Sequence, residues 1–225
     1  DKKKHSESIL GVSLTPTNAA WCLLETENNE PKIKEFGLLD QLFDSPADAF
    51  EALLEHTPMP TKVDCHVVLG HQYYDMILVD TPEVSDLELR DAVRWKVKDL
   101  VSRNIETSVV DVFRLPEDAY RGRMNMVYAA VVDTQNIVDL VSACHRADIP
   151  LETIGVNELA MTDLGLALPT AENKAMAFLY LNGNGGTINL VEQGYLYLTR
   201  TIEVNMDNEV FSGNMNFKAD PADNL

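Results

Sequence analysis

The residues that could most directly do chemistry form a glycine-rich segment, Asn182-Gly183-Asn184-Gly185-Gly186. Glycines let backbone amides approach a phosphate closely and form an anion-binding nest. No Lys-Ser or Lys-Thr pair follows the segment, so it is not a Walker A loop. It opens a predicted strand rather than a helix, so it is not a dinucleotide-binding fingerprint. A hairpin turn with residues at positive φ is the simpler interpretation.

A second group of candidates, Cys65, His66 and His71, contains residue types that bind zinc. The strand predicted between the two histidines would turn them to opposite faces, because they lie five positions apart. No further pair of Cys or His completes four ligands. Cys144 and His145 are neighbours on a predicted helix and point about 100° apart, which predicts a core thiol beside a surface imidazole. We therefore predict neither catalytic nor metal-binding residues.

The composition limits the classes of partner. The 225 residues include 36 Asp and Glu against 18 Lys and Arg, a formal charge of −18, which argues against nucleic acid as a ligand. The basic cluster at residues 2–4 is interpreted as a solvated tail. No apolar run approaches the roughly 18 to 20 residues of a membrane span. Three widely spaced cysteines predict reduced thiols in a cytosolic protein.

Several aromatic side chains could either anchor a partner or pack in the core. We favour core packing for them, because large aromatic residues are mostly buried. The residues concerned are Tyr73, Tyr74, Trp95, Tyr195 and Tyr197.

The elements that must position the candidates begin with a hairpin. Apolar runs at 9–14 and 19–25 flank a polar turn, and 33–39 predicts a third strand. Ser45 and Pro46 are typical of a helix start, and Pro58 with Pro60 ends that helix. Because two prolines interrupt both helix and strand patterns, residues 58–61 are the predicted subdomain boundary.

Residues 62–156 predict one α+β layer, with helices on one face of a sheet. The strands at 63–69 and 76–79 are expected to form a hairpin. A capping box from Ser85 to Glu88 then opens a helix. Strands at 109–115 and 124–132 precede a helix capped by Thr134, and a strand at 151–156 follows. The apolar positions expected on the buried helix faces are Leu89, Val93, Val97 and Leu100, and then Ile137, Leu140, Val141 and Cys144.

The last part of the pattern resembles the first. A short helix at 157–168 precedes strands at 175–181, 187–192 and 195–203. The two hairpins suggest two related α/β halves. Residues 205–225 carry only isolated apolar side chains, so we expect a mobile segment or the start of missing structure, and hence a truncated second half.

The order of elements and four segments together resemble the cytoplasmic actin-like proteins of type IV pilus and type II secretion assembly, the PilM and GspL group, including its members for MSHA-type pili. The segments are ILGVSLTPTNAAWCLLE, LVDTPEVSDLELRDAVRWKVKDL, YAAVVDTQNIVDLVSACHRADIPLETIGVNELA and LYLNGNGGTINLVEQGYLYLTRTIEV.

The resemblance implies an α/β fold of the actin-like (ribonuclease H-like, hexokinase-type) ATPase class with an inserted α+β subdomain. The first lobe would begin with residues 1–61. Residues 62–156 would hold the insert and the return to the first lobe, and 157–225 the crossover helix and an incomplete second lobe.

The resemblance also implies two phosphate hairpins. In active members they carry an acidic residue and glycines that manage Mg²⁺, water and the β- and γ-phosphates. Here the first hairpin has Gly11, Ser13 and Thr15 without an acidic residue in the turn, and the second has Asn182 where an Asp is expected. A neutral amide neither holds Mg²⁺ nor orients an attacking water. We expect no hydrolysis and no resident cofactor, although the backbone of Gly183, Gly185 and Gly186 could still cradle an ATP phosphate.

The favoured hypothesis is a non-enzymatic scaffold at the cytoplasmic face of the bacterial inner membrane. The resemblance implies the pilus assembly ATPase and PilN-like platform proteins as partners, without nucleic acid, and leaves a homodimer open. One alternative is an active ATPase that uses other acids, for example Glu203 or Asp207. A second alternative is an unrelated acidic α/β interaction domain.

Overall fold

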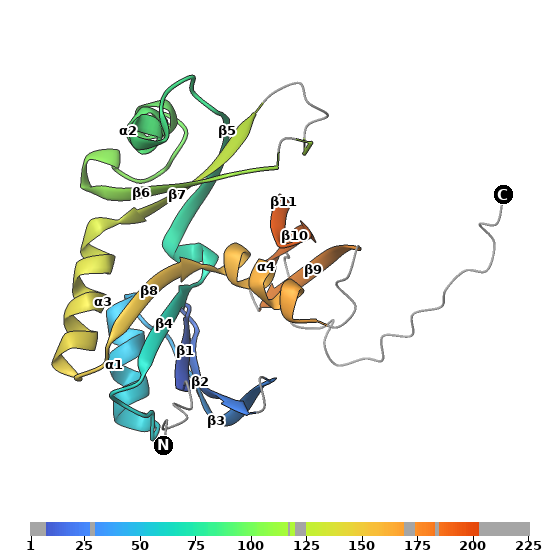
Figure 1. Cartoon of the computed structure of the whole chain (residues 1–225). Helices are drawn as coiled ribbons and strands as arrows, with labels where there is room; N and C mark the ends of the chain where they lie inside the picture. The colour runs from blue at the N-terminus through green and yellow to red at the C-terminus, as the bar shows by residue number, and fades with distance from the viewer. Residues whose placement is uncertain are drawn as a thin grey trace, which may run out of the picture.

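The computed structural model describes residues 8–27, 30–116, 118–119, 125–168, 174–182 and 185–202. Its first sheet has five strands in the order β3-β2-β1-β4-β8 (Figure 1). β1, β2 and β3 form an antiparallel meander, whereas β1, β4 and β8 run parallel. The strands are β1 (Ser8–Leu14), β2 (Asn18–Glu27), β3 (Glu30–Asp40), β4 (Asp64–Leu69) and β8 (Leu151–Val156). The predicted opening hairpin and its third strand are confirmed.

Two helices, α1 (Pro46–His56) and α3 (Thr134–Arg146), pack against each other and against this sheet. α1 begins as predicted, because the Ser45 hydroxyl accepts a hydrogen bond from the Asp48 amide at 3.1 Å. Its buried face meets the inner face of the meander, where the Trp21 indole donates to Thr57 Oγ1 at 2.8 Å. A Cβ at Gly37 would overlap that indole, so the close approach of β3 requires glycine there. These elements, β1 to β4, α1, α3 and β8, are called the first lobe.

A second sheet projects from the first lobe. Its three antiparallel strands lie in the order β5-β7-β6, and α2 packs on one face. A short 3-10 turn at His71–Tyr73 precedes this unit, and another at Ile105–Thr107 lies within it, between α2 and β6. The elements are β5 (Tyr74–Asp80), α2 (Asp86–Val97), β6 (Ser108–Arg114) and β7 (Met126–Asp133), and together they are called the insert.

The structure corrects part of the predicted layout. The hairpin of 63–69 with 76–79 is wrong, because β4 pairs with β1 and β8 whereas β5 pairs with β7. The range 62–156 is therefore not one layer, since β4, α3 and β8 lie in the first lobe. Alternating apolar residues identify a strand without identifying its neighbours.

Details of two helices also differ from expectation. The capping box at Ser85 is confirmed, but Leu100 lies beyond the end of α2 and is exposed. For α3, Asp133 occupies the N-cap position, so Thr134 is the first helical residue rather than the cap. Val141 is also exposed, so the buried stripe of α3 is narrower than predicted.

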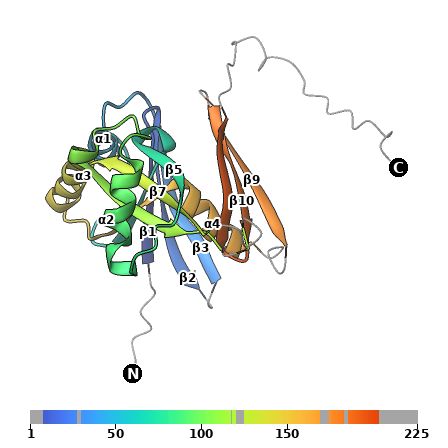
Figure 2. The ribbon, with the colours of Figure 1, turned by 90° about the horizontal axis from the view of Figure 1, so that it is seen from above.

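The chain then crosses to a third sheet. α4 (Asn157–Ala167) contacts β4 and β8 on one side and β10 and β11 on the other, so it lies between two sheets (Figure 2). The three antiparallel strands, called the second meander, are β9 (Ala175–Asn182), β10 (Gly185–Glu192) and β11 (Tyr195–Ile202). Like β1, β2 and β3, these strands pair with their neighbours in sequence order. The expectation for 205–225 lies outside the described residues.

No helix in the described part of the chain is long and apolar enough to cross a membrane.

Candidate functional site

The turn of the first hairpin uses its own hydrogen-bonding groups internally. Thr15 Oγ1 accepts from the amides of Thr17 at 3.3 Å and Asn18 at 2.9 Å, and donates to the Asn18 carbonyl at 2.9 Å. The Thr15 amide also donates to that carbonyl at 2.9 Å. Pro16 has no N–H. Every backbone donor of this turn is therefore occupied, whereas a phosphate cradle needs amides that point outward.

The other two residues predicted in the first hairpin lie within β1. Gly11 pairs with Cys22 and Ser13 pairs with Ala20 in the antiparallel ladder. Ser13 is exposed on the outer face of the meander, opposite the side chains that pack on α1. The structure thus places Gly11 and Ser13 along the strand and only Thr15 in the turn.

In the second hairpin, the described glycine residues lie within paired strands. Asn182 pairs with Gly185, and Gly186 pairs with Leu181. A Cβ at Gly186 would overlap the Tyr180 carbonyl oxygen, so this glycine is explained by the approach of two strands. Gly183 lies outside the described residues, as do Glu203 and Asp207, the acids of the ATPase alternative.

The predicted cysteine and histidine environments are largely confirmed. Cys65 and Cys144 are buried, and burial raises their pKa values to about 12 and about 11. His145 is exposed beside Cys144. His66 Nδ1 lies 2.9 Å from Thr153 Oγ1, and His71 lies in a 3-10 turn rather than in the strand. Within the described ranges, no group of three His, Cys, Asp or Glu side chains is arranged to hold a metal ion.

The five aromatic candidates differ in burial, and Tyr197 is half-buried. Tyr73 and Tyr74 are buried, which confirms core packing for this pair. Trp95 and Tyr195 are exposed, so the same prediction is wrong for them. Trp95 carries Lys98 Nζ 5.4 Å from its ring centroid, a cation–π contact at the surface of α2.

A groove of about 210 Å³ separates the insert from the first lobe. The helix-free face of the insert forms one wall, and α3, β8 and α4 form the other (Figure 1). Asp111 is the only charged residue among those that line it, and Val109 is 43% exposed there. The lining residues are Leu69, Val109, Asp111, Phe113, Ala130, Val132, Ile137, Ile154, Gly155, Val156 and Leu159.

A buried polar pair, Tyr74 and Glu158, connects the insert to α4. The Tyr74 hydroxyl donates to Glu158 Oε2 and accepts from the Asn157 amide at 3.2 Å. Both side chains are almost inaccessible to solvent. Burial raises the pKa of Glu158, although donation from Tyr74 opposes the rise, and burial beside Glu158 raises the pKa of Tyr74 well above its ordinary value. The pair joins the first residue of the insert to the crossover helix.

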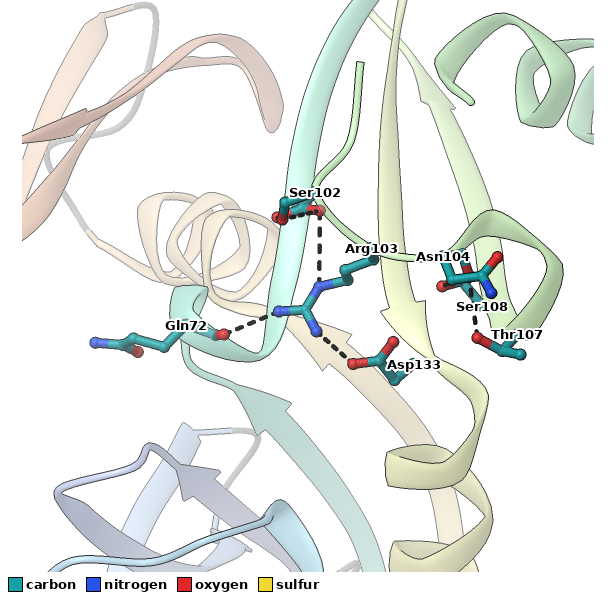
Figure 3. A network of polar contacts seen from close by, with 8 residues as sticks. Gln72, Ser102, Arg103, Asn104, Thr107, Ser108 and Asp133 are labelled. Atoms are coloured by element: carbon teal, nitrogen blue, oxygen red, sulfur yellow. Dashed lines mark hydrogen bonds and ion pairs between the residues drawn. The ribbon is translucent and has the colours of Figure 1, made fainter. Parts of the chain in front are cut away.

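Arg103 holds the two chain segments that connect the insert to the first lobe. Its guanidinium donates to Asp133 Oδ2 at 2.6 Å and to the Gln72 carbonyl at 3.0 Å, as Figure 3 shows. Its Nε lies 3.7 Å from Asp75 Oδ2. Gln72 and Asp75 lie where the chain enters the insert, and Asp133 lies where it leaves. The Arg103 side chain therefore contacts both chain segments that connect the insert to the first lobe.

No family model matches the chain, and no curated protein sequence matches it. Solved structures do resemble it. The cytoplasmic domain of EpsL, an inner-membrane component of the type II secretion system of Vibrio cholerae, matches with a TM-score of 0.58 and 12% identity, over 87% of this chain and 71% of that chain. PilM in the PilM-PilN type IV pilus biogenesis complex matches with a TM-score of 0.64 and 19% identity, over 87% of this chain and 61% of that chain.

A third match is a protein of unknown function from Bacteroides thetaiotaomicron with an actin-like ATPase fold. Its TM-score is 0.55 and its identity 11%, over 91% of this chain and 73% of that chain. The chain has an actin-like ATPase fold. It spans about three fifths of the length of the PilM chain, 61%.

Within this actin-like fold, sequence reasoning missed Glu158, Arg103 and Asp133, and it placed Tyr74 in the core without its partner. The partners are distant in sequence, since Tyr74 and Glu158 are 84 positions apart and Arg103 and Asp133 are 30 apart. The available signals were Asp133 at the end of a predicted strand and Glu158 at the start of a predicted helix, where ligand-facing or bridging residues are common in α/β folds. By contrast, Gly186 was recognisable from its residue type, and the structure uses it for the close approach of two strands.

Proposed function

We propose that this chain is a non-enzymatic scaffold of type IV pilus assembly, of the MSHA type, at the cytoplasmic face of the inner membrane. It would connect the assembly ATPase to the inner-membrane platform. Two observations support the proposal: four segments resemble the PilM and GspL group, and the fold is similar to PilM and to the EpsL cytoplasmic domain.

The observation that carries the non-enzymatic part is the closed turn at residues 15–18. An actin-like ATPase must direct amides and an acidic residue at the phosphates and Mg²⁺. Here Thr15 occupies the amides of Thr17 and Asn18, and the turn has no carboxylate. Binding a phosphate would require these hydrogen bonds to break. Each broken bond that leaves a partner unpaired costs on the order of 1 kcal/mol or more.

The groove beside the insert is the proposed docking site for a segment of a platform protein. PilM forms a complex with PilN, which motivates a PilN-like partner. The lining is apolar apart from Asp111, and Val109 and Leu159 are exposed within it. An apolar segment with a basic residue near Asp111 would complement this surface.

Calorimetric titration with Mg-ATP tests the absence of an ATPase site. The proposal expects no heat of binding at micromolar concentrations and no phosphate release. Micromolar affinity accompanied by turnover would contradict the scaffold function and favour the active-ATPase alternative.

A second experiment tests the groove. A fluorescent peptide from the cytoplasmic segment of the PilN-like protein is titrated into the wild type, Val109→Glu and Leu87→Glu. Leu87 is 94% exposed on α2, away from the groove, and is the matched control. We expect a carboxylate at Val109 to weaken binding at least about tenfold, since about 1.4 kcal/mol corresponds to a factor of ten, while the control binds normally. Equal binding by all three proteins would exclude the groove.

A further inference from the structure

The insert has a second contact surface that its sequence did not predict. Cross-strand pairing places Leu78, Tyr128 and Phe113 in one row across the insert sheet, on the face opposite α2. This row packs against the second meander rather than against the first lobe. Tyr128 is 3% exposed, and Leu196 of β11 is 5% exposed in the same apolar cluster. Val191 of β10 completes the contact.

Two hydrogen bonds reinforce this apolar contact. The Thr199 amide of β11 donates to Tyr128 Oη at 3.1 Å. The Tyr197 hydroxyl donates to Asp118 Oδ1 at 3.1 Å, from the same strand to the loop that follows β6. The bond to Tyr128 is partly buried, and the bond to Asp118 is exposed. The insert and β11 are therefore joined by packing, by a backbone donor and by a surface hydroxyl.

The position of this contact gives it a mechanical consequence. The crossover helix α4 lies between the first lobe and the second meander and contacts both. The insert supplies a second bridge, because it leaves the first lobe at β4, returns at α3 and touches β10 and β11. Two separate bridges oppose hinge motion about α4 more strongly than one, because a rotation must break both.

We propose that the insert is a latch that holds the second meander against the first lobe without a nucleotide. The latch consists of Phe113, Leu115, Tyr128, Val191 and Leu196. It would replace the phosphate and metal contacts that hold the two lobes of an actin-like ATPase together. The inference goes beyond the scaffold function and does not depend on the identity of the partner.

Phe113 also connects the latch to the groove. Its ring lines the groove, and its centroid lies 5.5 Å from that of Tyr128, with the planes tilted by 31°. An occupant of the groove that displaces Phe113 therefore disturbs Tyr128, whose hydroxyl accepts the Thr199 hydrogen bond. Groove occupancy and latch closure are physically linked through these two rings.

Hydrogen exchange of the whole protein, read by mass spectrometry, tests the latch. The variants are Leu196→Ala, which removes latch packing, and Tyr128→Phe, which keeps the ring and removes the acceptor. Leu179→Ala is the control, because Leu179 is exposed on the opposite face of the second meander. Each variant is measured with and without Mg-ATP.

We expect both latch variants to accelerate exchange across residues 185–202 at least threefold while residues 8–14 keep their protection. Neither the control variant nor the addition of Mg-ATP should change the exchange rate of either segment. Unaltered exchange over 185–202 in Tyr128→Phe and Leu196→Ala would overturn the proposal, as would protection of that segment by Mg-ATP. If Leu196→Ala exposes the entire chain, Tyr128→Phe decides the question. If both latch variants change the exchange rate as expected but the wild type does not bind the PilN-like peptide, only the proposed docking function is rejected.

Discussion

Replacing Tyr74 by Phe removes one hydroxyl from the junction of insert and crossover helix. Glu158 Oε2 then loses its donor and the Asn157 amide loses its acceptor, while the aromatic ring still fills its buried site. A hydrogen bond to a charged group contributes about 1.5 to 3 kcal/mol and a neutral one about 1 kcal/mol. We therefore expect Tyr74→Phe to lower the free energy of unfolding by about 2 to 4 kcal/mol at pH 8.

The loss of unfolding free energy in Tyr74→Phe should depend on pH, because the Glu158 carboxyl group titrates. Burial raises the pKa of Glu158 in the folded protein, so its contribution to stability is present below the ordinary carboxyl pKa and is lost as pH rises through the raised value. The Tyr74 hydroxyl stabilises the ionised form. Without it the pKa of Glu158 rises further, so Tyr74→Phe should be more damaging at pH 8 than at pH 5.

Urea unfolding followed by circular dichroism at pH 5 and pH 8 measures both quantities. Tyr195→Phe is the matched control, because Tyr195 is exposed and its substitution should stay within about 0.5 kcal/mol. Tyr74→Phe is also combined with Glu158→Gln, which should remove most of the pH dependence. A loss below about 0.5 kcal/mol, or the same loss at both pH values, would refute the claim that this buried pair fastens the insert.

Three further predictions concern the rest of the structure. Thr15→Val should lower stability by about 1 to 2 kcal/mol in thermal unfolding, because two turn amides lose their acceptor; an unchanged midpoint would contradict the closed turn. Arg103→Met should speed proteolysis at the base of the insert severalfold, whereas Arg146→Met, which breaks only an exposed ion pair with Glu51, should not. Equal digestion rates of the two variants would show that Arg103 does not hold the two connections together. In native protein at pH 8, iodoacetamide should modify Cys22 ahead of Cys65 and Cys144, because burial raises the pKa of all three thiols but only Cys22 is partly exposed; mass spectrometry after unfolding should show all three modified.

Local signals in the sequence were sufficient to predict most elements. Ser45 with Pro46 located the start of α1, and the box from Ser85 to Glu88 located that of α2, because caps depend on residues three or four positions apart. The strands on either side of the Asn182 to Gly186 segment pair antiparallel as predicted, whereas the turn residues Gly183 and Asn184 lie outside the described residues. These features need no information about distant parts of the chain.

Strand partnership could not be obtained in the same way. β4 and β5 are adjacent in sequence and both contain short apolar runs, yet each pairs with strands dozens of residues away. Likewise, the family resemblance made Thr15 a candidate phosphate ligand, and only the three-dimensional arrangement shows that the amides of Thr17 and Asn18 already donate to its hydroxyl. The groove is invisible in sequence for the same reason, since β6, β7, α3, β8 and α4 all contribute to it.

The insert enters and leaves the first lobe at touching positions. Tyr74 and Val132 are direct cross-strand partners, so the two ends of a unit of nearly sixty residues are as close as neighbouring strands allow. Such a unit can grow, shrink or exchange its outer surface without moving β4 or α3. Its two ends stay adjacent, and the entropic cost of closing the chain between them rises only slowly with its length. The surface residues of the insert can therefore diverge while the first lobe beneath it stays constant.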